Sequence, residues 1–177
     1  MTRIGTIKKK SLKCVGQKSV SLSHIYMTVW PEIVPIVLKY HETNGHPMQI
    51  YNCPIYSAAL YCVQHGRKVF DHIDDLNFVK MNCEYYKNNS QKYKVTMVRR
   101  LRKIIKSIRK NGYAAGNYNA RYSGLRRGVS PLFGAVNGYE IVSGKHRIAA
   151  AAALGYKSMV CDIWININVT RKSNRGI

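Results

Sequence analysis

Five consecutive residues, Ser143-Gly144-Lys145-His146-Arg147, combine the backbone and the side chains that a phosphate-binding turn needs. Three basic side chains follow a glycine directly, and the alanines after them predict a helix that begins at Lys145. The first amides of a helix have no partner inside the helix and carry a partial positive charge, so a helix N-terminus attracts anions. This spacing therefore predicts an anion site, most often for phosphate, at the start of the helix.

Two strands and the helix are expected to hold this turn in place. Residues 139–142 are a short apolar run that follows the turn pair Asn137-Gly138, a pattern that predicts a strand. The helix is expected over residues 145–154, and Gly155 stands at the usual C-cap position. Residues 158–163 predict a second strand, so the turn belongs to a strand–turn–helix–strand unit.

The net charge limits the kinds of partner. There are 29 Lys and Arg against 8 Asp and Glu, a formal charge of +21, which indicates a polyanion and by default DNA or RNA. An anionic membrane surface is the weaker alternative, and no membrane partner is predicted. No spanning helix is expected, because no run of 18 apolar residues occurs. The five cysteines lack tight pairing and fit reduced thiols in a cytosol.

The clearest helix is expected over residues 95–110, inside a segment that has no acidic residue. Residues 87–128 hold thirteen basic residues, and apolar side chains recur every three or four positions in the helix, which predicts one buried stripe. A solvated face is the alternative for the basic side, but such a face usually mixes charges. The candidate nucleic-acid contacts in this helix and in the tyrosine-containing loop after it are Arg99, Arg100, Arg102, Lys103, Lys106, Arg109, Lys110, Arg121, Arg126 and Arg127.

The chain is expected to have three parts and the fold class α+β. Residues 1–23 are polar and basic and predict a flexible arm, with an arm lying on a phosphate backbone as the alternative. Residues 24–86 predict a mostly helical N-terminal section, and residues 87–177 a compact domain that carries the turn. Within the N-terminal section, the patterns favour helical elements at residues 31–41, 55–64 and 73–79.

The turn and its flanking elements resemble the ParB/sulfiredoxin superfamily. Its members carry a strand, a five-residue motif at a helix start, and then an alanine-rich helix that ends in Leu-Gly. The motif has Asp or Gly at its first position, Gly at its second, any residue at its third, His or Arg at its fourth, and Arg at its fifth. Here these positions read Ser143 to Arg147 and Leu154-Gly155, and the upstream helix with Leu101–Gly112 also matches. The resemblance covers roughly residues 95–165. It implies a small mixed sheet with helices.

The resemblance also implies a role for the turn. In that superfamily the turn binds the phosphates of a nucleotide, and the corresponding residues here are Ser143, Gly144, Lys145, His146 and Arg147. Lys145 stands where sulfiredoxins have a catalytic cysteine and where ParB proteins have a glutamate, and Ser143 stands where the superfamily's kinases have an aspartate. These differences disfavour the chemistry of the known enzymes.

The remaining catalytic candidates are His146 and Glu140. His146 is a candidate base, with a donor to phosphate as the alternative, and Glu140 lies on the strand that leads to the turn, where a solvent-facing residue is the alternative. The acidic cluster at residues 71–75 fits a helix N-terminus better than a cation site, so no metal site is predicted. An enzyme of this superfamily would use a nucleoside triphosphate with Mg²⁺.

Three functions follow from these features. The first is a nucleic-acid-associated protein that holds DNA or RNA with the turn and the basic helix. The second is a nucleotide-dependent enzyme, namely a nuclease, an NTPase or a phosphotransferase such as a kinase. The third is a basic structural subunit of a phage or another nucleoprotein assembly. The expected location is the cytoplasm, either on a nucleoid or, for a viral protein, in the host cell.

Overall fold

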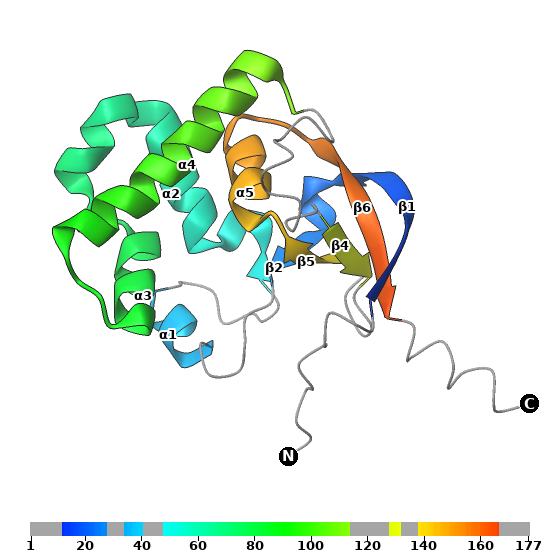
Figure 1. Ribbon diagram of the computed structural model, residues 1–177, viewed down its shortest axis with the longest axis horizontal. Helices are drawn as coiled ribbons and strands as arrows, with labels where there is room; N and C mark the ends of the chain where they lie inside the picture. Colours follow the sequence, from blue (N-terminus) through cyan, green and yellow to red (C-terminus); the bar gives the residue numbers. More distant parts are fainter. Residues whose placement is uncertain (1–11, 28–33, 41–47, 114–127, 132–137, 167–177) are drawn as a thin grey trace, which may run out of the picture.

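The computed structural model combines one mixed β-sheet with a group of helices on one side of it (Figure 1). It describes the following residues: 12–27, 34–40, 48–113, 128–131 and 138–166. The presence of both helices and a sheet agrees with the α+β class expected from the sequence. Across the described residues, no helix has the length and apolar character that a bilayer span requires.

The sheet has six strands in the order β1-β6-β4-β5-β2-β3. The strands are β1 (Leu12–Ser21), β2 (Ile25–Met27), β3 (Met48–Gln49), β4 (Gly128–Pro131), β5 (Tyr139–Ser143) and β6 (Ser158–Asn166). The pairs β1–β6, β4–β5 and β2–β3 are antiparallel, whereas β4–β6 and β2–β5 are parallel. The C-terminal half of the chain thus forms the centre of the sheet, and the N-terminal strands form both edges.

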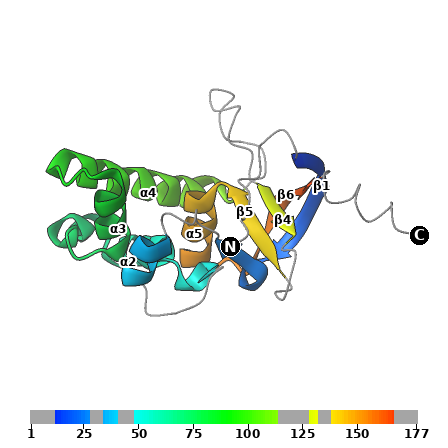
Figure 2. The same cartoon turned by 90° about the horizontal axis from the view of Figure 1, so that it is seen from below.

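The helices gather on one side of the sheet, with α5 lying between the sheet and the others (Figures 1 and 2). They are α1 (Val34–Lys39), α2 (Pro54–His65), α3 (Asn77–Tyr86), α4 (Gln91–Asn111) and α5 (Lys145–Ala153), with the 3₁₀ helix η4 (Gly66–His72) after α2. Residues from Ile148 to Ala153 are all buried, because α2, α4 and the sheet surround α5. The small alanine side chains let these neighbours approach the α5 backbone closely.

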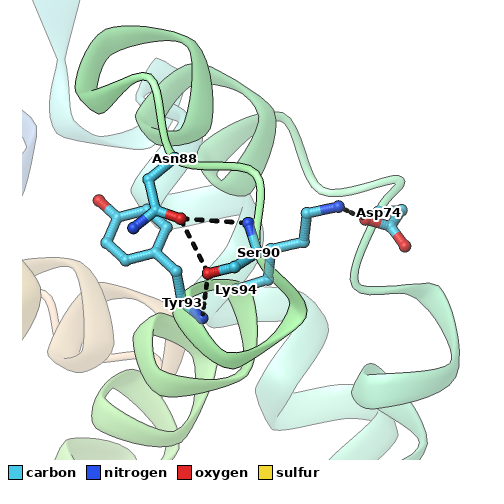
Figure 3. A network of polar contacts seen from close by, with 5 residues as sticks. All are labelled: Asp74, Asn88, Ser90, Tyr93 and Lys94. Carbon is cyan, nitrogen blue, oxygen red and sulfur yellow. Dashed lines mark hydrogen bonds and ion pairs between the residues drawn. The ribbon is translucent and has the colours of Figure 1, made fainter.

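Helix α4 buries one stripe, as its sequence predicts. Val98, Leu101, Ile105 and Ile108 are at most 3% exposed and recur at helical spacing. The helix begins four residues earlier than expected because Ser90 caps it, accepting a hydrogen bond from the Tyr93 amide (Figure 3).

The start of α4 is fixed by a small polar network (Figure 3). The Asn88 side-chain oxygen accepts hydrogen bonds from the amide of Ser90, at 3.1 Å, and from its hydroxyl, at 2.8 Å. One turn further, the Lys94 ammonium pairs with the Asp74 carboxylate, which comes from the segment after η4. The N-terminus of α4 is therefore tied both to the turn before it and to the N-terminal section.

The N-terminal part of the chain differs from its expected form. Residues 12–21 lie within the expected flexible arm, but they form β1 and pair with β6 along its length. The expected division at residue 87 does not separate two cores, because one cluster of buried side chains extends from Val20 to Cys161. The N-terminal section also supplies β2 and β3 as well as helices, and it is thus a structural part of the same sheet.

Two further local expectations need correction. The third helical element, expected at residues 73–79, lies instead at 77–86 as α3, and η4 precedes it. The expected loop after α4 contains the short strand β4, which inserts between β5 and β6. Strand β4 could not be recognised from local periodicity, since it is only four residues long.

Candidate nucleic-acid interface

The turn before α5 has the backbone of an anion site. Gly144 is the N-cap residue and adopts φ 82° and ψ 18°, a left-handed conformation that glycine reaches without a steric penalty. The Gly144 carbonyl accepts the amides of Arg147, at 2.9 Å, and Ile148, at 3.1 Å. Within the described structure, no group accepts the amides of Lys145 or His146. The first turn of α5 therefore presents two backbone donors beside three basic side chains.

Arg100 from α4 adds its positive charge to this turn. Burial, and secondly the charge of Arg100, lower the pKa of Lys145, although part of this long side chain remains exposed to solvent. Burial followed by the charges of Lys145 and Arg100 lowers the pKa of His146 to about 4. The positive charges are close enough to disfavour one another, so an anion bound here would be stabilised by all of them.

His146 points toward the helical side of the molecule. Its ring meets the Phe78 ring of α3 edge to face, with 5.9 Å between the centroids. The His146 side chain is half-buried and neutral at physiological pH, because its pKa lies well below 7. His146 therefore serves the turn as a neutral ring with a backbone donor, and not as a third cation.

The two catalytic candidates lie on opposite faces of the sheet. Tyr139 pairs with Ile25, which is fully buried beneath the helices, so Tyr139 faces the core. Glu140 pairs with Tyr26 and, by strand alternation, faces the other way, whereas Ser143 has the orientation of Tyr139. Glu140 is thus not brought toward His146, and Ser143 is the residue of this strand that shares a face with the turn.

Helix α4 presents a run of basic side chains to solvent. Arg99, Arg100, Lys103, Lys106, Arg109 and Lys110 are exposed. Arg102 is half-buried, with its guanidinium 5.2 Å from the centre of the Phe70 ring. Arg109 donates to the Val63 carbonyl at 3.3 Å.

We call the exposed residues Arg99, Arg100, Lys103, Lys106 and Lys110 the α4 basic face. None of these five side chains forms an ion pair with a carboxylate that the structure describes. Ion pairs occur elsewhere in the described structure, at Lys39–Glu84, His72–Asp75 and Lys94–Asp74. The α4 basic face therefore has no internal counter-charge in the described part of the chain.

The structure joins two residue sets that the sequence treats as separate. Arg100 was expected to contact nucleic acid, and Lys145, His146 and Arg147 were expected to contact a phosphate. The charge of Arg100 acts on Lys145 and His146, where α4 packs against α5. Arg121, Arg126 and Arg127 lie outside the described residues. No group of three His, Cys, Asp or Glu side chains suited to a metal occurs among the residues that the structure describes.

Sequence reasoning missed the aromatic side chains beside α4. Tyr61, His65 and His72 form a cluster of ring contacts on α2 and η4, and Phe70 of η4 contacts the Arg102 guanidinium. The spacing of Tyr61 and His65, one helical turn apart on α2, could have indicated their contact. The contact of Phe70 with Arg102 depends on the packing of η4 against α4, which no local pattern encodes.

The chain was compared with protein-family models, with curated proteins and with solved structures. No family model matches, and neither a curated protein nor a solved structure is similar to it.

Proposed function

We propose that this protein binds DNA or RNA through the α4 basic face and the turn at the start of α5. The observation that carries this proposal is the run of exposed basic side chains along α4, which lacks ion-pair partners among the described carboxylates and includes Arg100, whose charge acts on the turn. A phosphate backbone supplies regularly spaced negative charges to such a surface, and releasing its counterions favours association.

In this proposal the two parts of the surface have different tasks. The side chains of the α4 basic face neutralise several phosphates without fixing one geometry, because they are long and exposed. The turn is more selective, since a phosphate there accepts hydrogen bonds from the Lys145 and His146 amides while Arg100 lies close. The sequence resemblance to ParB/sulfiredoxin-like domains supports the same role for the turn, and that domain assignment is part of the proposal.

The proposal is tested with the triple variant Arg99→Gln/Lys103→Gln/Lys106→Gln, which replaces three basic side chains with neutral ones. We expect this variant to bind a duplex of about 20 base pairs about 10- to 100-fold more weakly than the wild type at low salt, as measured by fluorescence anisotropy. The matched control is Lys13→Gln/Lys80→Gln/Lys157→Gln, which removes the same charge from exposed positions on other elements. Equal losses in both variants would show a general charge effect and contradict the proposed interface.

A nucleotide-binding function is the second candidate, and the open amides of the turn favour it. A nucleoside di- or triphosphate would place its terminal phosphate at Lys145 and His146. We expect such a ligand to raise the melting temperature of the wild type, and we expect Arg147→Ala to remove the shift. Strand alternation gives Glu140 the orientation opposite to that of Ser143, the residue that precedes the turn.

A further inference from the structure

An aromatic surface adjoins the α4 basic face. The rings of Tyr61 and His65 are stacked, with centroids 4.1 Å apart and planes inclined by 29°, and His72 approaches the Tyr61 ring edge-on at 6.1 Å. Phe70 lies beneath the Arg102 guanidinium. His65 and His72 are exposed, while Tyr61 and Phe70 are half-buried, so the outer rings of the cluster contact solvent.

The aromatic surface and the basic face are continuous across α4. Arg102 and Arg109 lie two turns apart on the same side of the helix, and they contact Phe70 and the Val63 carbonyl respectively. Lys106 stands between them and is exposed. A strand of nucleic acid whose phosphates follow α4 would therefore have flat rings within reach on the α2 side.

Two of the three acidic residues beside this surface have a partner within the protein, whereas the exposed Asp71 of η4 forms no ion pair with a described cation. Asp74 pairs with Lys94, and Asp75 lies 3.5 Å from the His72 ring nitrogen. Arg102, which contacts Phe70, forms no ion pair with a described carboxylate. The surface thus joins flat rings to positive charge, the combination by which proteins hold single strands.

We propose that Tyr61, His65 and His72 form a base-stacking site for a single-stranded nucleic acid whose phosphates lie along the α4 basic face. This inference rests on the proposed function and specifies its partner. The bases of a duplex are already stacked on one another and offer no free faces, whereas each base of a single strand can stack on a ring. The α4 basic face alone would bind either form.

His65 provides the cleanest test, because it is exposed and ends α2. We expect His65→Ala to weaken the binding of a single strand of about 20 thymidines or uridines about 5- to 30-fold, and to change duplex affinity less than about twofold. His65→Phe keeps a flat ring without the imidazole nitrogens and should retain wild-type affinity. Tyr86→Ala removes a 60% exposed ring from α3 and serves as the control.

The measurements are fluorescence anisotropy titrations at pH 7.5, with circular dichroism to confirm that each variant is folded. Tyr61→Leu is the second variant, since it removes the inner ring of the stack and keeps an apolar side chain. A loss confined to the thymidine or to the uridine strand supports the site and identifies which of the two strands it accepts. Unchanged single-strand affinity in both variants, or an equal loss for duplex and single strand, overturns the stacking site alone. If no probe shows salt-dependent binding, the proposed function is overturned as well.

Discussion

Lys94, in the first turn of α4, and the basic residues of the turns that follow lie in opposite surroundings. The Lys94 side chain is only 13% exposed, and its ammonium pairs with Asp74 (Figure 3). The α4 basic face is exposed and has no partner among the described carboxylates. A cation that loses its hydration needs a counter-charge inside the protein, whereas a cation in water does not.

The difference separates a structural cation from cations available to a ligand. Arg99, Lys103, Lys106 and Lys110 follow one another at spacings of three and four, so each repels its neighbour on the same face. Each such like-charge pair costs about 0.2–0.5 kcal/mol in a helix. An external polyanion that binds this face would relieve the repulsion along several turns of the helix.

The buried stripe of α4 provides the largest expected effect. Leu101 is fully buried opposite the basic face, and Leu101→Ala should lower the free energy of unfolding by about 3 kcal/mol because it leaves a cavity between α4 and its neighbours. Chemical denaturation of the variant and the wild type measures this change. A loss below about 1 kcal/mol would show that α4 is not anchored by this stripe.

His146 reports on the charges that surround the turn. Its pKa is lowered in the folded protein to about 4, so the unfolded chain binds more protons than the folded chain between that pH and about 6.5. Stability should therefore fall as the pH drops through this window, by on the order of 2 kcal/mol near pH 4.5.

The matched comparison for this effect is His146→Asn, in which this component should disappear from the pH profile of thermal unfolding. A bound phosphate should raise the pKa of His146 in an NMR titration, because it offsets the charges of Lys145 and Arg100. Identical pH profiles for the variant and the wild type would contradict the burial of this imidazole.

Lys94 is expected to matter for stability and not for binding. Lys94→Ala removes a mostly buried stem and the partner of Asp74, so it should reduce the free energy of unfolding by about 1 kcal/mol. Duplex affinity should stay within about twofold of the wild type, since this ammonium already has a counter-charge. A larger loss of affinity would place Lys94 in the interface and remove the distinction between the two parts of α4.

Lys103 is expected to matter for binding and not for stability, and its replacement should give the smallest change in the free energy of unfolding. Lys103→Ala relieves repulsion with Arg99 and Lys106, and alanine favours the helix, so the free energy of unfolding should rise by a few tenths of a kcal/mol, about 0.3. Duplex affinity should fall several-fold. A destabilised Lys103→Ala variant would indicate an internal partner for this ammonium.

Sequence patterns were informative where the structure is local. The stripe of α4 and the alanine run of α5 are read directly from helical periodicity and composition, and both helices lie close to their expected positions. Gly144 also has the left-handed conformation that favours a glycine at the start of the turn. The strands that flank the turn, β5 and β6, were found for the same reason.

Contacts between distant parts of the chain could not be predicted in this way. The basic, polar residues of β1 resemble a solvated tail, because an edge strand can keep Lys13 and Lys18 exposed while it pairs with β6. The proximity of Arg100 to the turn depends on how α4 packs against α5, and no spacing in the sequence encodes that crossing. The sequence therefore predicted the basic helix and the turn separately, but not that they lie close together.

The salt dependence of duplex binding tests the central claim most directly. The logarithm of the binding constant should fall linearly with the logarithm of salt concentration, by about 0.9 for each phosphate contact. We expect the slope of Arg99→Gln/Lys103→Gln/Lys106→Gln to be shallower than that of the wild type by about 2 to 3, and the slope of the Lys13, Lys80 and Lys157 control to be unchanged. Equal slopes for all three proteins, or binding that does not depend on salt, would contradict a phosphate interface on α4.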